Sequence, residues 1–291
     1  MNHPFDLLKS NLLDLLHELR EADIRLIVGG GYGLYVKRQH LQATEETHLL
    51  PLISEARSTN DLDLFLTTQI LVDPEKSRVV LRAMQALQCE TVLSKENFQF
   101  TRRLDYEEQA YEIKFDFLTK MPDAAAEIEL LDVQKVRVRG NKHGGVHAHL
   151  TKEAIAVEDN PILVALAGLR TTGEEFSGQV YLPQAYSYLM MKLFAFRDWE
   201  TVKKKPGNAS KHALDVYSIV SMMTEVELAT AEMSSRKYRL VPAAQEASSI
   251  VSEFFSGSAT MGIIRLREHP YFDRDVDITE FMSILTDLFP R

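Results

Sequence analysis

The stretch Arg57-Ser58-Thr59-Asn60-Asp61-Leu62-Asp63-Leu64-Phe65 is the most informative part of this sequence. Two carboxylates one residue apart within an apolar run are typical of a β-strand, whose side chains alternate between two faces. Asp61 and Asp63 would then share one face, with Leu62 and Leu64 on the other. Two acids at this spacing can hold a divalent cation, and their oxygen atoms suit Mg²⁺. The alternative is a solvated strand face whose acids point to water.

The overall composition is that of an ordinary globular protein. Of the 291 residues, 45% are hydrophobic and 26% are charged, and this length suits two domains or one large domain. The net charge of −9 argues against a general nucleic-acid coat, although it allows a local basic patch such as Lys203-Lys204-Lys205. The single cysteine, Cys89, can form neither an internal disulfide nor a zinc cluster of cysteines.

The sequence shows no membrane or export signal. No apolar run approaches the roughly 18–20 residues that cross a bilayer, and residues 1–6 lack a basic segment followed by an apolar core. Together with the cysteine usage, this predicts a cytoplasmic protein without a membrane partner.

A glycine-rich turn precedes the acidic strand. Residues 24–28 are predicted to be a strand that leads into Gly29-Gly30-Gly31-Tyr32-Gly33, and a helix is expected to begin near Gly31. Glycines let the backbone approach a ligand closely, and the first amides of a helix point outward at the positive end of its dipole. The pattern therefore suits a phosphate site, although it is neither a P-loop nor Gly-x-Gly-x-x-Gly. An ordinary tight turn is the alternative.

A third acidic residue lies on a later predicted strand, residues 113–118. Alternation places Lys114 and Asp116 on one face of this strand and the aromatic residues on the other. The glycine turn, the Asp-x-Asp strand and this lone Asp together fit phosphoryl transfer through two metal ions about 3.5–4 Å apart. An exposed strand end is the alternative for Asp116.

The remaining chain supplies mainly helices. Helices are predicted at residues 4–22, from Pro74 onward, and at 183–198, 211–224, 241–256 and 277–288. An inserted loop or a short helix is expected at 38–56, and a linker at 199–210. Further strands are predicted at residues 91–94, 98–104 and 133–138. His143, His147 and His149 cluster in a Gly-rich segment, which we interpret as an exposed hairpin rather than a metal site.

These residues resemble a known family. Gly30-Gly31-Tyr32-Gly33-Leu34 followed by Arg57-x-Thr59-x-Asp61-x-Asp63 looks like the signature of the polymerase-β-like nucleotidyltransferase superfamily, and within it of the AbiEii-type toxins. In that group a later helix carries a lysine, matched here by Met191-Lys192-Leu193, and another carries a basic residue before an Asp, matched by residues 211–217. The resemblance spans residues 24–220. Tyr32 departs from it, because many members have Ser or Thr there.

The resemblance implies a fold and a set of site residues. The expected fold is α+β, with an N-terminal nucleotidyltransferase domain on a mixed sheet (residues 1–180) and a C-terminal helical domain that completes the nucleotide and acceptor cleft (residues 181–291). The implied catalytic and metal-binding residues are Asp61, Asp63 and Asp116, and the implied nucleotide-binding residues are Gly30, Gly31, Tyr32, Arg57, Thr59, Lys192 and Asp215. Asp116 would help to deprotonate the acceptor hydroxyl, Lys192 would reach the nucleotide phosphates, and Asp215 would orient Lys192 or a substrate group.

The activity implied by the resemblance is transfer of an NMP unit from an NTP to a hydroxyl group, with two Mg²⁺ ions. In the toxin-like branch the acceptor would be tRNA, and an antitoxin protein would restrain the enzyme, as in a toxin–antitoxin or phage-defence system. A protein hydroxyl or a small molecule such as an aminoglycoside is an alternative acceptor for the same site. The rival from another class is a non-catalytic module that binds nucleotide or docks a partner.

Overall fold

The computed structural model describes residues 4–51, 59–92, 98–106, 109–122, 129, 131–132, 137–138 and 144–291. The chain divides into two compact units, each assembled from three separate segments. The first unit comprises Met1–Gly33, Ser58–Thr151 and Pro161–Leu182, and the second comprises Leu34–Arg57, Lys152–Asn160 and Pro183–Arg291.

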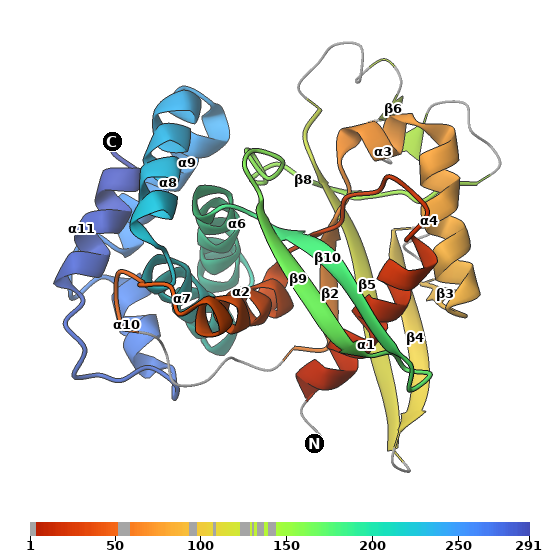
Figure 1. Cartoon of the computed structure of the whole chain (residues 1–291). Coiled ribbons are helices and arrows are strands. Elements are labelled where there is room, and N and C mark those ends of the chain that lie inside the picture. Colours follow the sequence, from red (N-terminus) through yellow and green to blue (C-terminus); the bar gives the residue numbers. More distant parts are fainter. Residues whose placement is uncertain are drawn as a thin grey trace. The chain divides into compact units, whose positions relative to one another are not determined.

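The first unit is built on a sheet of eight strands within the described part of the chain (Figure 1). These strands are β1 (Ile27–Val28), β2 (Asp61–Phe65), β3 (Glu90–Thr91), β4 (Gln99–Tyr106), β5 (Gln109–Lys120), β8 (His149–Thr151), β9 (Ile162–Leu169) and β10 (Glu175–Leu182). Their order in space is β3-β4-β5-β2-β1-β10-β9, with β8 also paired to β5. The sheet is mixed, because β2 runs parallel to β5 but antiparallel to β1. A short ribbon of β6 (Leu131–Asp132) and β7 (Arg137–Val138) lies outside it.

Helix α1 (Pro4–Glu18) covers the face of the sheet that carries Leu62 and Leu64. It packs against β2, β9 and β10, and a Cβ atom added to Gly178 of β10 would lie 3.2 Å from the Leu16 side chain. The leucine spacing that predicted this helix also supplies its buried side, where Leu8 and Leu12 are completely buried. After β2 come α3 (Thr68–Val72) and α4 (Pro74–Ala86).

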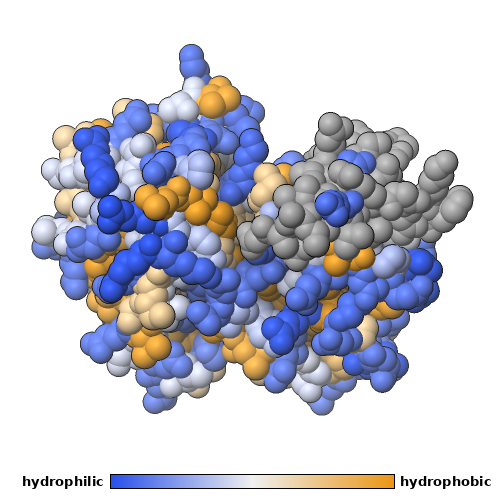
Figure 2. All heavy atoms as spheres, turned by 90° about the horizontal axis from the view of Figure 1, so that it is seen from above, coloured by the Kyte–Doolittle hydropathy of each residue, from blue (hydrophilic) through white to orange (hydrophobic). Residues whose placement is uncertain are grey.

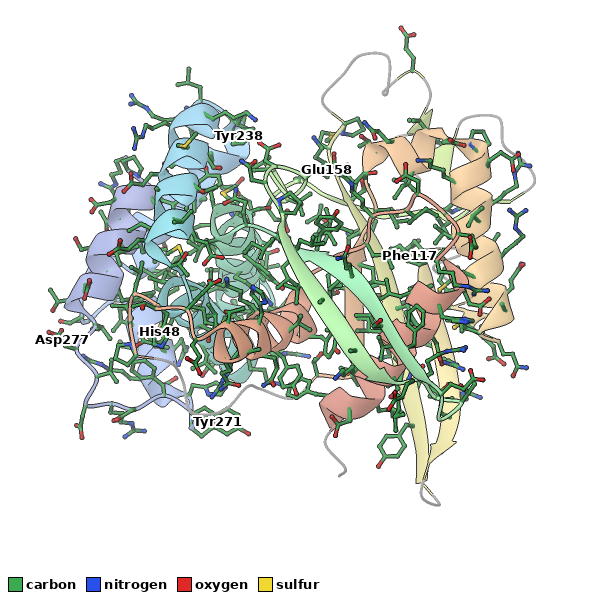
Figure 3. All side chains as sticks on the ribbon, viewed as in Figure 1. His48, Phe117, Glu158, Tyr238, Tyr271 and Asp277 are labelled. Carbon is green, nitrogen blue, oxygen red and sulfur yellow. The ribbon has the colours of Figure 1, made fainter. Side chains whose placement is uncertain are left out.

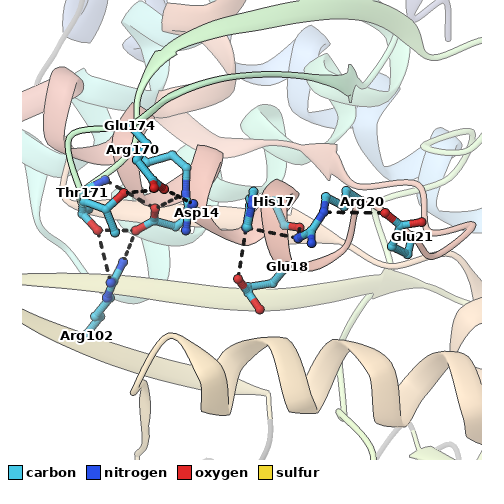
Figure 4. A network of polar contacts seen from close by, with 10 residues as sticks. Asp14, His17, Glu18, Arg20, Glu21, Arg102, Arg170, Thr171 and Glu174 are labelled. Atoms are coloured by element: carbon cyan, nitrogen blue, oxygen red, sulfur yellow. Dashed lines mark hydrogen bonds and ion pairs between the residues drawn. The ribbon is translucent and has the colours of Figure 1, made fainter.

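A buried polar cluster fastens α1 to the sheet (Figure 4). The Asp14 side chain is only 1% exposed, and its carboxylate lies 2.7 Å from Nη1 of Arg102 on β4 and 3.1 Å from Nε of Arg170. The Thr171 hydroxyl also donates a hydrogen bond to Asp14. Burial by itself would raise the pKa of Asp14, but the hydrogen bonds from Arg102 and Thr171 and the charge of Arg102 outweigh it and lower that pKa.

The second unit is helical. Its helices are the later part of α2 (Gly30–Thr44), α6 (Ala185–Arg197), a π-helix η1 (Asp198–Val202), α7 (Pro206–Ser221), α8 (Glu225–Tyr238), α9 (Pro242–Phe254), α10 (Met261–Glu268) and α11 (Thr279–Leu288). Their sequence marks the starts: Pro206 and Pro242 stand in the first turns of α7 and α9, and Thr224 with Glu227 forms a capping box on α8. Aromatic side chains from several helices, among them Tyr217 and Phe281, meet in the core.

Residues 152–160 are tied to this helical unit by polar contacts. Oδ2 of Asp159 accepts hydrogen bonds from Nζ of Lys237 and from the hydroxyl of Tyr238, both at 2.6 Å. Figure 3 labels Tyr238, which ends α8.

The expected α+β class, with a mixed sheet followed by a helical part, is confirmed.

Several predictions of individual elements were wrong. The predicted linker at 199–210 contains η1 and the start of α7. Residues 38–44 continue helix α2, which agrees with the helical alternative for that segment and not with the loop. Strands β9 and β10 and helices α8 and α10 occupy residues for which no element was predicted. The strands predicted at 91–94 and 133–138 lie partly outside the described residues.

One face of the described residues can be judged for the polarity of its side chains. Hydrophilic residues predominate on the face shown in Figure 2, and the apolar ones gather in small patches. None of the helices that the structure describes combines the length and the hydropathy needed to cross a bilayer.

Candidate functional site

Asp61 and Asp63 stand on β2 as the alternation predicts. Both are half-buried, while Leu62 and Leu64 between and after them are completely buried on the other face. The backbone N–H of Asp61 donates to the Oγ1 atom of Thr59 at 3.3 Å, which fixes the chain where the strand begins. The hydroxyl of Thr59 therefore forms a turn that supports the start of the acidic strand.

Asp116 lies beside Asp63 in the neighbouring strand. In the parallel pair of β2 and β5, Asp63 is in register with Asp116, and Asp61 is in register with Lys114. Side chains at matching positions of adjacent strands project from the same face, so the three carboxylates share one side of the sheet. Lys114 adds a positive charge opposite Asp61 on this side. Phe117, which Figure 3 labels, is completely buried on the opposite face.

The glycine turn lies directly against Asp63. The backbone N–H of Gly29 donates to the carbonyl oxygen of Asp63 at 2.8 Å, and α2 begins at the next residue, Gly30. Gly30 has a φ angle of +63°, and a Cβ atom there would come within 1.8 Å of Oδ2 of Asp63. Only glycine fits this position, because both its backbone angle and the space beside it exclude a side chain. The predicted order of a strand, a glycine turn and a helix is confirmed here. It brings the positive end of helix α2 beside the carboxylate of Asp63.

Gln99 completes the acidic face and was not found by sequence reasoning. It stands on β4 in register with Asp116 in the antiparallel pair, and its side-chain amide donates a hydrogen bond to Oδ1 of Asp116. No motif marks Gln99, and only the register of β4 against β5 reveals its position.

The side chain of Tyr32, implied for nucleotide binding, does not face a ligand site. The Tyr32 ring is completely buried, with its centroid 6.3 Å from that of Phe5 on α1, so its side chain is not available to a ligand. Arg57 lies outside the described residues. Gly31, like Gly30, belongs to the first turn of α2.

Lys192 and Asp215 form a buried ion pair inside the helical unit. Nζ of Lys192 on α6 lies 2.7 Å from Oδ2 of Asp215 on α7, and Nδ1 of His212 lies 3.6 Å from the same oxygen atom. Asp215 and Lys192 are therefore in direct contact, as one of the two roles implied for Asp215 requires. Nothing about their contact requires a bound nucleotide, because each already has a partner of opposite charge.

The histidine cluster differs from its prediction. His149 is the first residue of β8 and pairs in register with Leu118 of β5, so it is part of the sheet and not of an exposed hairpin. This register puts His149 on the same face as Asp116, and its ring centroid lies 6.0 Å from that of Phe98. His143 lies outside the described residues.

The oxygen atoms of Asp61, Asp63 and Asp116 suit Mg²⁺, but in the structure these side chains are not grouped closely enough to hold a metal ion. Their oxygen atoms are the ligands that Mg²⁺ prefers, and Asp63 and Asp116 are immediate neighbours in register. In the part of the chain that the structure describes, no three His, Cys, Asp or Glu side chains are grouped closely enough to hold a metal ion. A cation held here would therefore have to draw the side chains of Asp61, Asp63 and Asp116 toward one another.

Comparisons with known proteins give two structural likenesses. The chain resembles the crystal structure of an antigenic nucleotidyltransferase-like protein from Paracoccidioides brasiliensis, with 15% identity, a TM-score of 0.41, and coverage of 88% of this chain and 97% of that one. It also resembles the solution structure of the antibiotic-resistance factor ANT(2'')-Ia, with 12% identity, a TM-score of 0.37, and coverage of 80% and 94%. No protein-family model and no curated protein matches the chain. Both TM-scores and both identities are low, so these two likenesses carry no argument about function.

Proposed function

We propose that this protein is an Mg²⁺-dependent nucleotidyltransferase, which transfers an NMP unit from an NTP to an acceptor hydroxyl. One observation carries the proposal: Asp63 lies beside Asp116 in adjacent parallel strands, with the backbone of Gly30 against its carboxylate. A carboxylate pair next to a glycine-lined helix start combines the two parts that nucleotidyl transfer needs, which are ligands for a cation and backbone amides for phosphates.

The acids would take different parts in the reaction. Asp61 and Asp63 would hold Mg²⁺, with Asp116 as a further ligand, and the bound ions would neutralise the charge of the triphosphate. The acceptor oxygen forms a bond to the α-phosphorus, the bond from that phosphorus to the pyrophosphate oxygen breaks, and pyrophosphate leaves. Asp116 accepts the proton of the acceptor hydroxyl.

The glycine turn would bind the triphosphate. The backbone amides of Gly30, Gly31 and Tyr32 lie at the start of α2, where the helix dipole favours negative charge. Thr59 would keep the acidic strand in place, as its contact with the Asp61 amide suggests. Arg57, Lys192 and Asp215 remain nucleotide-binding candidates by resemblance.

For the acceptor we favour tRNA, with a separate antitoxin protein as the restraining partner in a defence or toxin–antitoxin system. This part rests on the resemblance of the motifs between residues 24 and 220. A protein hydroxyl or an aminoglycoside would require the same carboxylates and the same leaving group. A cytoplasmic location, expected from the cysteine usage, would supply both NTP and Mg²⁺.

The proposal is tested by labelling acceptors with α-³²P-NTPs. The wild-type protein is incubated with Mg²⁺, each labelled NTP and total RNA, a protein extract or an aminoglycoside. We expect label on one acceptor class, and loss of at least about 100-fold of it in Asp61→Asn and Asp63→Asn, because these changes remove the anionic ligands but keep the side-chain size. Asp277→Asn, which changes an exposed acid far along the sequence, should leave the labelling unchanged.

Two results would count against an enzyme. Equal labelling by the wild type and the Asp63→Asn variant would show that the acids do not serve the reaction. If calorimetry shows that the protein binds an NTP, but no acceptor mixture leads to release of pyrophosphate, the non-catalytic module is favoured.

A further inference from the structure

The hydrogen bond between Gln99 and Asp116 links the acidic face to a strand that carries none of its acids. Gln99 is half-buried on β4, directly opposite Asp116 of β5, and its Nε2 donates to Oδ1 of that carboxylate. One of the two oxygen atoms of Asp116 therefore has a fixed partner within the sheet.

The backbone around Gln99 is held on both sides. The carbonyl oxygen of Gln99 accepts a hydrogen bond of 3.2 Å from the amide of Val92, and the Phe98 carbonyl accepts one of 2.8 Å from Phe117. On the other face, the rings of Phe100 and Phe117 meet edge to face at 5.7 Å and are both buried. These contacts keep β4 from rotating, so the side chain of Gln99 stays directed at Asp116.

The type of residue at position 99 also matters. An amide can donate one strong hydrogen bond to a carboxylate without cancelling its negative charge, whereas a lysine or arginine there would neutralise it. Asp116 thus keeps its charge for a cation or a proton while its orientation is set. Hydrogen bonds of this kind to metal-binding carboxylates are known to influence metal affinity and activity strongly.

We propose that Gln99 is a positioning residue for Asp116: it holds Oδ1 and thereby directs Oδ2 to the metal ion and the acceptor hydroxyl. This inference rests on the proposed nucleotidyltransferase function. It adds a residue from β4 to a site otherwise formed by β2, β5 and the glycine turn.

The kinetic test compares Gln99→Met with the wild type. Methionine has nearly the size of glutamine but cannot donate the hydrogen bond. We expect kcat for nucleotidyl transfer to fall by about 10–100-fold, with the KM for the NTP changed less than about twofold, because the triphosphate is bound elsewhere. Thr101→Val is the matched control, since Thr101 lies on the same strand and the same face, opposite Lys114, and its kcat should equal that of the wild type.

A second readout does not depend on turnover. Binding of Mn²⁺, followed by electron paramagnetic resonance, should be about 10-fold weaker in Gln99→Met than in the wild type and unchanged in Thr101→Val. Gln99→Asn is the second variant in case Gln99→Met does not fold. Its amide is one methylene too short to reach Asp116, so the same two losses are expected.

The outcomes separate the two proposals. If Asp63→Asn abolishes transfer but folded Gln99→Met or Gln99→Asn retains wild-type kcat and Mn²⁺ affinity, the positioning role is overturned and the enzymatic function stands. A rise in the KM for the NTP with kcat unchanged would also overturn it. If the wild type neither transfers nucleotide nor binds Mn²⁺, the proposed function fails, and the role of Gln99 fails with it.

Discussion

Lys192 of α6 and Asp215 of α7 form an ion pair of 2.7 Å in which the two side chains are only 9% and 3% exposed. Moving two charges out of water costs nearly as much as their attraction returns, so the pair as a whole adds little to stability. Removing one partner alone destabilises the fold, because the charge of the other then stays buried without compensation.

The first prediction concerns this pair. Lys192→Met and Asp215→Leu should each lower the free energy of unfolding by about 3–5 kcal/mol, whereas the double variant should lie close to the wild type. Urea denaturation of the four proteins measures this. If the loss in the double variant equals the sum of the single losses, the two side chains are not coupled as the structure indicates.

The double variant also separates two roles of Lys192. Should it fold with normal stability yet bind NTP more weakly than the wild type, this pair of residues serves nucleotide binding as the resemblance implies. Unchanged NTP affinity would restrict Lys192 to holding α6 against α7.

The second prediction concerns Gly30. Alanine there would be strained at a φ angle of +63°, and its Cβ would push the Asp63 carboxylate away, so Gly30→Ala should cost about 1–3 kcal/mol of stability and most of the transferase activity. Gly207→Ala is the control, because a Cβ at this exposed helical position meets nothing within 4 Å. Thermal unfolding and initial rates measure both variants. Normal activity in Gly30→Ala would mean that the close approach to Asp63 is not needed.

The third prediction concerns the acid stability provided by Asp14. Because its pKa is lower in the folded protein than the ordinary value of 3.8, the carboxylate stabilises the fold above that value, and this stabilisation is lost as the pH falls through the folded pKa. Asp14→Asn should therefore be less stable than the wild type by about 3–5 kcal/mol at pH 7, and the difference should shrink below about pH 4. Urea midpoints between pH 7 and pH 3 measure this, with the exposed Asp6→Asn in the same helix as control. A constant difference over the whole range would exclude a role for the Asp14 charge.

The fourth prediction concerns Cys89. Burial raises the pKa of its thiol to about 12, so at pH 8 the reactive thiolate is roughly 1,000-fold scarcer than for a thiol at the ordinary value of 9.0. Iodoacetamide should modify the native protein very slowly and the urea-unfolded protein fast. Mass spectrometry over time follows the reaction, and equally fast modification of both forms would contradict the raised pKa of the thiol.

The central features of the fold could be predicted because their patterns are local. Alternation placed Asp61 and Asp63 on one face of β2, and the glycine run predicted a helix from near Gly31, one residue after the observed start of α2 at Gly30. The same alternation placed Asp116 on the polar side of β5. What the sequence could not supply was the register between strands, which brings Asp116 beside Asp63 and Gln99 beside Asp116.

The elements that were not predicted lack a clear hydrophobic periodicity in their sequence. In β9, Leu163 and Leu169 are exposed while Val164 and Leu166 are buried, so apolar residues occupy both faces and the alternation disappears. Helix α8 buries the small side chains Ala231, Ser234 and Ser235, which carry almost no hydrophobic signal. In both cases the contacts of the folded protein override a weak local preference.

The parallel pairing of Ile27 with Tyr181 joins strands that lie more than 150 residues apart in the chain. During synthesis the centre of the sheet cannot close until the nascent chain has passed residue 182, which takes roughly 8–30 s at about 5–20 residues per second. Throughout this interval the leucines of α1 lack part of the surface that later shields them. Productive folding in the cell thus depends on protecting an unfinished N-terminal half, and truncation before β10 should yield aggregates rather than a smaller folded protein.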